Sequence, residues 1–191
     1  MTENVALYTR IGYRPVRTGP LEEAYPALAP RLASRIDLAN PPHVPTFEPA
    51  VERLRRDGHD VTITARDHAQ TLGLARRAFG DVLVVGGESP GRRARKALTI
   101  ADRARALVGV ARRLSPDVAL SHGSYAQLVA ARVVGVPGVT MMDYEHQPAN
   151  HVSFRLAARV VVPTLFPQRA LRRFGADPRR VVRYDGFKEE L

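Results

Sequence analysis

The sequence predicts an α/β protein in which a parallel β-sheet is flanked by helices. From Arg35 onward, short apolar runs alternate with longer amphipathic segments, as in Val61–Thr64 followed by Ala69–Phe79. The apolar runs are rich in valine and isoleucine, and polar residues follow most of them directly. Strands that alternate with helices pair in parallel through right-handed crossovers, so their carboxyl ends meet at one edge of the sheet. Ligands of open parallel sheets bind at that edge, where we therefore expect a functional site.

The first predicted unit is a strand, a helix and a second strand. The strand covers about Arg35–Leu38, and the helix buries Phe47, Val51 and Leu54, which recur at helical spacing. Three residues are expected to mark this helix. Thr46 is the predicted N-cap, Pro49 lies in the first turn, and Gly58 ends the helix.

The same alternation continues to the end of the chain. Strands are expected at 61–64, 82–85, 118–120, 139–142 and 160–162. Helices are expected at 69–79, 94–111 and 125–134, and a last pair brackets 160–162, its second member at 166–174. Val82–Val85 is apolar at every position, which is typical of a strand covered by helices on both faces.

Composition limits the class of protein. With 45% apolar and 25% charged residues, the chain has the composition of a globular domain. It contains no cysteine, which excludes disulfides and thiolate metal sites and favours a cytoplasmic location. No apolar run approaches the ~20 residues of a membrane span, and the N-terminus does not resemble a signal peptide. We expect no transmembrane segment, while contact with a membrane surface stays open.

The net charge of +10 comes almost entirely from arginine, since Lys96 and Lys188 are the only lysines. Such a surface attracts anions, including nucleotides and acidic lipids. The sequence lacks the aromatic and basic interleaving of single-strand binders and any zinc-finger spacing. We therefore predict no nucleic-acid partner and assign the charge to solvated helix faces.

Four segments from residue 36 onward carry a family resemblance. They are Ile36–Val44, Gly58–Asp67, Pro116–Ser124 and Asp143–His146. Together they resemble the "domain of unknown function 354" family, which is similar to GT-B glycosyltransferases and UDP-N-acetylglucosamine 2-epimerases. The resemblance implies a Rossmann-like domain corresponding to the N-terminal half of a GT-B fold, with an active cleft between two halves. In such enzymes the first half usually holds the acceptor and the second half the nucleotide sugar.

The chain ends at Leu191, about where the first half of such a protein would meet the second. The resemblance therefore implies an acceptor-side half that binds a sugar- or lipid-linked ligand and is catalytically incomplete alone. Its expected partner is a nucleotide-sugar-binding second domain or a separate chain. The alternative is a non-catalytic binding or interaction module.

Residues 1–33 do not fit the alternating pattern, and the prolines within 19–33 predict a linker. The segment before it, Thr2–Pro15, resembles the closing motif of GCN5-related N-acetyltransferases. That resemblance implies that Asn4 would contact coenzyme A and that Tyr8 would act as a general acid. We interpret the segment as a fusion remnant or the product of an upstream start site, with a link to acetyl transfer as the second alternative function.

Four residues are candidates for catalysis because imidazole and carboxylate groups at one edge can exchange protons: His43, His122, Glu145 and His146. Each follows a predicted strand, and a carboxylate beside an imidazole orients the ring and raises its basicity. Two prolines stiffen the turn before His43, although a rigid structural turn is the alternative interpretation. We expect His43, Arg66, His122 and Glu145 to converge along a single rim of the sheet.

Four further residues are candidates for ligand binding because they offer hydrogen bonds or charge at the same edge: Asn40, Arg66, Ser124 and Asp143. The fork of Arg66 suits phosphate or carboxylate, and Ser124 is also placed to cap the next helix. The helix after Asn40 would direct free amides and positive dipole towards an anion. The expected ligand is an anionic or glycan small molecule.

The remaining polar residues near strand ends are expected to be structural. Asp67 is predicted to N-cap the following helix, with His68 on the surface in its first turn. His59 and His151 lie outside the predicted site. The histidines and carboxylates would suit Zn²⁺ or Mn²⁺ but form no compact ligand motif, so we predict no metal site and no cofactor.

Overall fold

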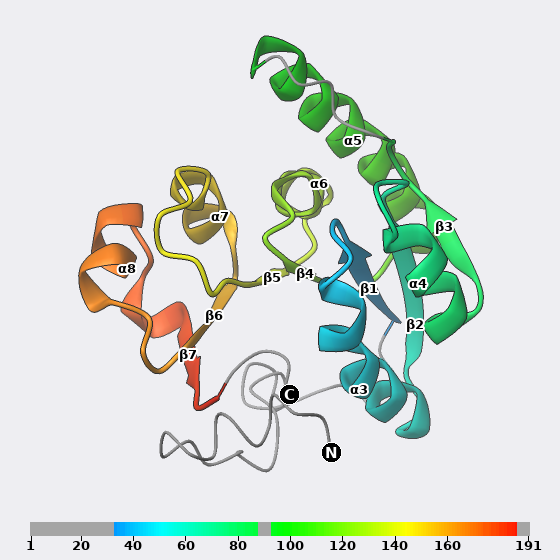
Figure 1. Ribbon diagram of the computed structural model, residues 1–191, viewed down its shortest axis with the longest axis horizontal. Coiled ribbons are helices and arrows are strands. Elements are labelled where there is room, and N and C mark those ends of the chain that lie inside the picture. The colour runs from blue at the N-terminus through cyan, green and yellow to red at the C-terminus, as the bar shows by residue number, and fades with distance from the viewer. Residues whose placement is uncertain (1–32, 88–92, 187–191) are drawn as a thin grey trace.

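A computed structural model describes residues 33–87 and 93–186 of the chain. Strands and helices alternate along these residues (Figure 1). The strands are β1 (Ala33–Leu38), β2 (Asp60–Ala65), β3 (Val82–Val84), β4 (Val118–His122), β5 (Gly138–Met141), β6 (Arg159–Pro163) and β7 (Val181–Tyr184). The helices are α3 (His43–Arg56), α4 (Thr71–Phe79), α5 (Arg93–Leu114), α6 (Tyr125–Val134), α7 (Asn150–Leu156) and α8 (Gln168–Phe174), with a short 3-10 turn at Pro178–Arg180.

The seven strands form one sheet in the order β3-β2-β1-β4-β5-β6-β7. Every neighbouring pair is parallel, which confirms the predicted α/β class with a Rossmann-like parallel sheet. The order reverses between β1 and β4, because the chain leaves β1 towards β2 and leaves β4 towards β5. Such a reversal is a topological switch point, where the connections after the two strands diverge and leave a crevice.

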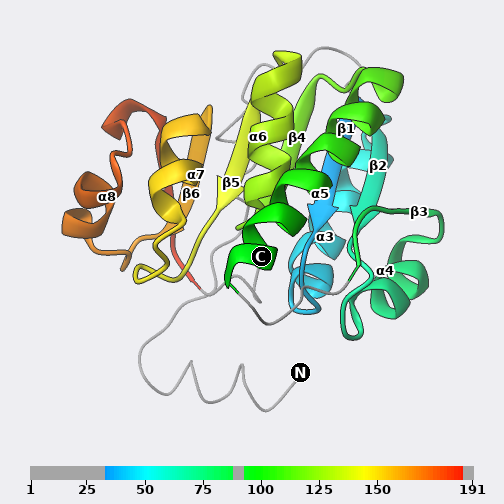
Figure 2. The same cartoon turned by 90° about the horizontal axis from the view of Figure 1, so that it is seen from above.

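The two faces of the sheet are covered by different helices. Side chains of α3 and α4 pack with the sheet in one apolar cluster that includes Ile36, Leu38, Phe47 and Phe79. On the other face, α5 packs closely beside α6, and α7 lies between α6 and α8 (Figure 2). Successive side chains of a strand alternate between the two faces. Ile36 and Leu38 therefore face α3, while Arg35 and Asp37 face α5 and α6.

The prediction that residues 82–85 form a strand covered on both faces is wrong. β3 is an edge strand, because the chain crosses from β3 to β4 on the far side of β1. The side chains of Leu83 and Val84 are 43% and 47% exposed. The crossover helix α5 is long enough to span the sheet and runs well beyond the other elements (Figure 1).

The N-terminus of α3 also differs from the prediction. The helix begins at His43, so Thr46 lies inside its first turn and donates a hydrogen bond from Oγ1 to the carbonyl of Pro42. Pro49 consequently lies in the helix interior rather than in the first turn. Gly58 does follow the helix end as expected, with a φ of +85°. The earlier start brings His43 directly to the edge of the sheet.

Two other expectations are corrected between β2 and α4. Asp67 does not cap α4, because the helix begins at Thr71 and Gln70 occupies the N-cap position. His68 lies in the turn before the helix and is half-buried rather than on the surface. The sequence pattern also missed β7, the short strand at the other edge of the sheet.

Candidate functional site

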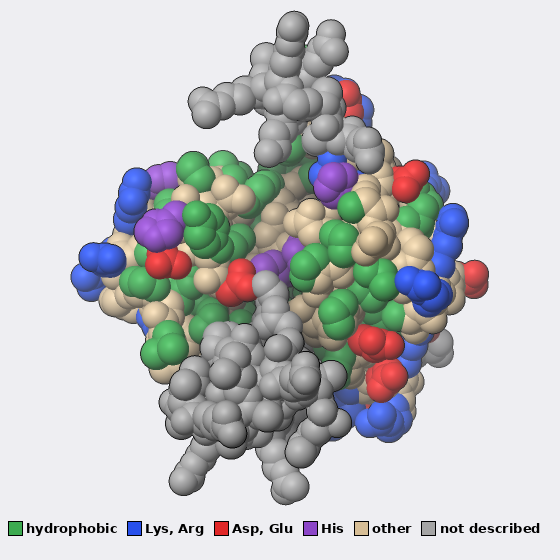
Figure 3. Space-filling view, viewed as in Figure 1, with side chains coloured by type: hydrophobic (Ala, Val, Ile, Leu, Met, Phe, Trp, Pro, Cys, Tyr) green, Lys and Arg blue, Asp and Glu red, His purple; other side chains and the backbone are tan. Residues whose placement is uncertain are grey.

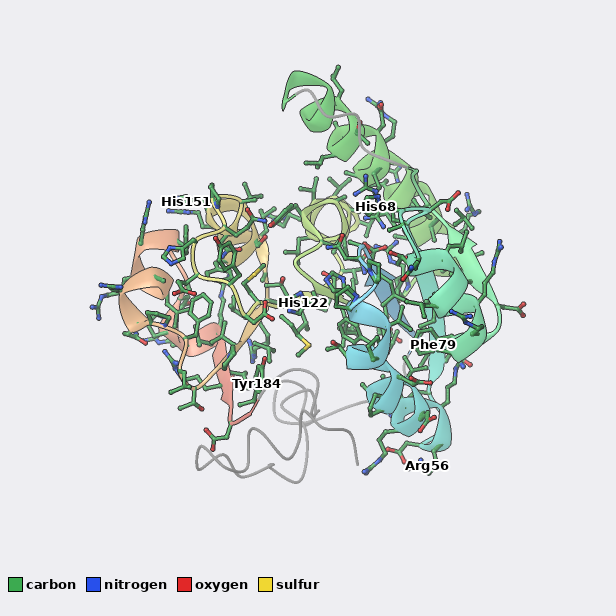
Figure 4. All side chains as sticks on the ribbon, viewed as in Figure 1. Arg56, His68, Phe79, His122, His151 and Tyr184 are labelled. Atoms are coloured by element: carbon green, nitrogen blue, oxygen red, sulfur yellow. The ribbon has the colours of Figure 1, made fainter. Side chains whose placement is uncertain are left out.

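Two histidines lie at the switch point between β1 and β4. His43 begins the helix that follows β1, and His122 is the last residue of β4, the strand beside β1. The two ring centroids are 4.7 Å apart, with the ring planes tilted by 44°. Figure 4 labels His122 near the centre of the molecule, and Figure 3 shows histidine side chains in a hollow of this face. The fold thus brings together two predicted site residues that are far apart in the sequence.

His43 is held in place by its own turn. Its amide donates to the carbonyl of Asn40 at 3.1 Å, and its Nδ1 accepts from the amide of Ala39 at 3.4 Å. The side chain is 5% exposed, so the ring is fixed by packing as well as by the turn. Because Nδ1 accepts a hydrogen bond, the proton of the neutral ring lies on Nε2.

His122 and Asp143 form the second contact of the site. The Nε2 atom of His122 lies 3.4 Å from Oδ1 of Asp143, which follows β5. His122 is 6% exposed, and its Nε2 is buried without a hydrogen bond among the described residues. The carboxylate side chain is 30% exposed. A buried imidazole beside a partly exposed carboxylate can accept, hold and return a proton.

Glu145 and His146 form a separate pair further along the same loop. Oε1 of Glu145 is 3.4 Å from Nε2 of His146, whose side chain is 65% exposed. The His146 ring packs edge-on against Tyr144, with centroids 5.6 Å apart. The pair lies at the predicted edge, but its contacts are with its own loop rather than with His122. It is more open to solvent than the His43–His122 pair.

The predicted ligand-binding residues occupy different environments. Asn40 is exposed in the turn before α3. Arg66 follows β2 and donates from Nε to the carbonyl of Gly87 at 2.7 Å, which ties it to the loop after β3. Both lie at the carboxyl edge. His151 instead packs against Phe174 at 4.9 Å, within the α7–α8 layer.

Ser124 is buried and caps α6, as its position after Gly123 predicted. Its Oγ accepts from the amide of Gln127 at 3.4 Å. The same hydroxyl donates to Oδ2 of Asp37 on β1. Ser124 is therefore anchored beneath the edge of the sheet, where it fixes the loop that carries His122.

Asp37 and Arg103 are the main polar residues of this region that sequence reasoning missed. Asp37 is fully buried and is paired with the guanidinium of Arg103 in α5, with an Nη2–Oδ1 distance of 2.7 Å. Burial alone would raise the pKa of Asp37, but the charge and hydrogen bonds of Arg103, with those from Ser124 and Thr64, outweigh it and lower the pKa. A signal was present, because charged residues alternate with apolar ones in Ser34–Leu38, inside a central strand.

Gly123→Ala is expected to lower the free energy of unfolding by about 1–2 kcal/mol, the cost of a side chain in the left-handed region. Gly123 has a φ of +60°, and an added Cβ would lie 3.1 Å from the terminal methyl of Met142, which can move away. The matched control is Gly109→Ala inside α5, where the nearest atom would be 3.8 Å away. That change should stabilise by about 0.5–1 kcal/mol. Urea denaturation of both variants measures the difference, and equal stabilities would contradict the strained backbone.

Neither a metal centre nor a membrane helix is found in the described part of the chain. Residues 33–87 and 93–186 contain no group of three or more histidine and acidic side chains placed to share a metal ion. None of their helices is long and apolar enough to cross a membrane. The proposed acetyltransferase-like positions, Asn4 and Tyr8, lie outside the described residues.

The fold is similar to parts of solved structures that are longer than the matched region. UDP-GlcNAc 2-epimerase from Neisseria meningitidis bound to UDP-GlcNAc is 14% identical, with a TM-score of 0.60, and the match covers 78% of this chain and 45% of that protein. MurG from Acinetobacter baumannii is 16% identical, with a TM-score of 0.59, and the match covers 71% of this chain and 43% of that protein. At these identities the likeness concerns the fold alone.

Sequence comparison gives the family. The uncharacterized protein MJ0665 of Methanocaldococcus jannaschii is 25% identical over 155 residues, which are 81% of this chain and 45% of that protein. The chain is therefore about half as long as this curated relative, and the match covers less than half of it. The profile of a family described as "Protein of unknown function (DUF354)" matches residues 32–191. This match covers most of the chain, which therefore belongs to the DUF354 family.

Proposed function

We propose that this chain is the acceptor-side half of a sugar-nucleotide enzyme and that it binds an anionic, sugar-containing ligand at the carboxyl edge of its sheet. The observation that carries the proposal is the chain of contacts His43–His122–Asp143, which lies at the switch point of the sheet. Imidazoles and carboxylates are common ligands of sugar hydroxyls, and they also transfer protons. These polar groups favour a ligand that forms hydrogen bonds over an apolar one.

The proposed division of roles follows from burial. The buried Nε2 of His122 lies 3.4 Å from Asp143 and makes no hydrogen bond among the described residues, and this nitrogen accepts the proton of a ligand hydroxyl. Asp143 lies 3.4 Å from that nitrogen and orients the ring towards the ligand. His43 packs against the His122 ring and limits its movement. Glu145 and His146, with their greater exposure, contact the outer part of the ligand together with Asn40 and Arg66.

The similar structures support the same placement. The Neisseria meningitidis structure is bound to UDP-GlcNAc, and this chain resembles under half of that protein. We therefore propose that the nucleotide is held by a second Rossmann half, supplied by a further domain or a separate chain. The DUF354 chain contributes the sugar side of the cleft. The alternative, a binding module without catalysis, uses the same edge but needs no proton transfer.

His122→Gln and His43→Ala are each expected to weaken binding of a cleft ligand at least tenfold, a loss of about 1.4 kcal/mol. The melting temperature of the free protein should change little, because neither ring lies in an apolar cluster. The measurement is a thermal-shift screen of UDP-sugars and glycan acceptors, followed by calorimetric titration of the best ligand. Tight ligands raise the melting temperature by mass action.

His59→Ala is the matched control, since His59 precedes β2 at the opposite edge of the sheet and should leave binding unchanged. Absence of any stabilising sugar or nucleotide sugar would contradict ligand binding. A large fall in the melting temperature of both site variants would show that the two histidines are core residues instead.

A further inference from the structure

We propose that Arg103 and Asp37 form a positioning pair that holds the loop of His122 in the geometry needed for ligand binding. The effect of the pair on ligand binding rests on the proposed function, whereas the geometry of the pair is that of the protein without ligand. Neither residue reaches the edge of the sheet, and both are buried beneath it, at 7% and 0% exposure. They act on the site through the residues to which they bond.

The pair is bidentate. Nη2 of Arg103 donates to Oδ1 of Asp37 at 2.7 Å, and Nη1 donates to Oδ2 at 2.8 Å. Thr64 on β2 also donates to Oδ1, at 2.7 Å. The planar fork of arginine matches the carboxylate in one orientation, so the pair fixes the angle of α5 against β1 as well as the distance between them.

Ser124 connects the pair to His122. Its hydroxyl accepts from Nη1 of Arg103 at 3.1 Å and donates to the carboxylate of Asp37. Two residues earlier stands His122, and between them the amide of Gly123 donates to the carbonyl of Met141 at 3.1 Å. The loop is thus held from β5 on one side and from the buried pair on the other. A shift of the Ser124 hydroxyl would move the His122 ring relative to Asp143 and His43.

The same guanidinium also holds the loop after β3. Its Nε donates to the carbonyl of Val85 at 2.9 Å. Gly86 follows, where an added Cβ would lie 3.0 Å from Cδ of Arg103, so this loop packs directly on the arginine. Gly87 then accepts from Arg66. Arg103 therefore bonds directly to residues at the carboxyl ends of β1, β3 and β4, and it reaches β2 through Asp37 and Thr64.

Stability alone does not account for this arrangement. A buried ion pair is often no more stabilising than apolar residues of the same volume, because both charges must leave water. What it does provide is a single allowed geometry, since a displaced buried charge loses its partners at high cost. A positioning role explains why the pair bonds to the loops at the sheet edge rather than only to helix and strand.

The experiment follows the six histidine imidazoles by two-dimensional ¹H–¹³C NMR of the full chain, at a pH above the titration of the rings. Cross-peaks are assigned by single histidine substitutions. In Ser124→Ala, the link to the pair is removed while Asp37 and Arg103 are retained. We expect the cross-peaks of His43 and His122 to move by more than their line width, whereas those of His59 and His151 stay in place.

Ser124→Thr keeps the hydroxyl and should restore the wild-type positions of both cross-peaks. Asp177→Ala is the control for loss of a cap, since Asp177 caps the turn at Pro178–Arg180, which precedes the edge strand β7. That variant should leave His43 and His122 unchanged. Arg103→Lys tests the fork, and it should move the same two cross-peaks because an ammonium cannot match both oxygens.

Unchanged His43 and His122 cross-peaks in a folded Ser124→Ala protein would overturn the proposal. If Ser124→Ala does not fold, Arg103→Lys decides by the same criterion. When a cleft ligand is available, Ser124→Ala should weaken its binding about tenfold and Ser124→Thr should not. Failure of the wild-type protein to bind any sugar ligand would contradict the proposed function but would leave the cross-peak test unaffected.

Discussion

Asp37→Asn is expected to lower the free energy of unfolding by about 3–5 kcal/mol, the usual cost of removing one partner from a buried ion pair. The substitution leaves the guanidinium of Arg103 buried against a neutral amide, and it disturbs the hydrogen bonds from Thr64 and Ser124. Urea denaturation monitored by circular dichroism measures the change. The expected loss is a large part of the stability of a domain of this size.

The matched control is Asp102→Asn, one residue away from Arg103 in the same helix. Asp102 lies 3.5 Å from Arg105, but both side chains are at least 75% exposed, so we expect a change within about 0.5 kcal/mol. Equal effects of the two substitutions would show that the buried pair contributes no more than a surface pair.

The pH dependence of stability follows from the same carboxylate. The pKa of Asp37 in the folded protein lies below its ordinary value of 3.8. The unfolded chain therefore takes up the proton first, so the stabilisation is complete above the ordinary carboxyl pKa and is lost as the pH falls through the lower folded value. Wild-type protein should lose stability more steeply than Asp37→Asn in this acid range. Parallel curves would contradict the assignment.

Phe47→Ala is expected to cost about 3–5 kcal/mol, the range for removing a large aromatic side chain from a core. Phe47 is 0% exposed and lies in the apolar cluster that joins α3 to β1 and β2. Because α3 begins at His43, loosening its packing should also weaken ligand binding at the switch point. Denaturant unfolding gives the stability, and calorimetric titration gives the binding.

Phe47→Leu is the companion variant, since it keeps most of the apolar volume and should cost no more than about 1.5 kcal/mol. Val152→Ala provides a surface comparison in α7, where the side chain is 45% exposed. A loss below about 1 kcal/mol for Phe47→Ala would mean that α3 is not held by this cluster.

The alternation of apolar runs and amphipathic segments was sufficient to predict the α/β class and the parallel sheet. It could not predict the strand order, because alternation is the same whether α5 crosses to a neighbouring strand or over the sheet. That is why Val82–Val85 was expected to be covered on both faces but lies at an edge of the sheet. β7 was missed because its four residues include an arginine and follow a charged turn.

Part of the candidate site was also predictable from the alternation of strands and helices. Polar residues after strands had to share one edge in a parallel sheet, and His43, His122 and Asp143 do lie in contact there. The role of Asp37 and Arg103 was hidden because 66 residues separate them, and only the packing of α5 on β1 brings them together. The side-chain environment of Ser124 depends on that same packing.

The buried charges on the α5 face of β1 do not balance. Arg35 is 0% exposed beside Asp37, and it donates from Nη1 to the carbonyl of Leu107. Two guanidiniums thus stand against one carboxylate, Asp37, the single fully buried acidic side chain among the described residues. Dissolved ions screen buried charges far less than surface charges. The attraction between the buried guanidiniums and an anion at the carboxyl edge would therefore persist at ionic strengths that screen the surface arginines.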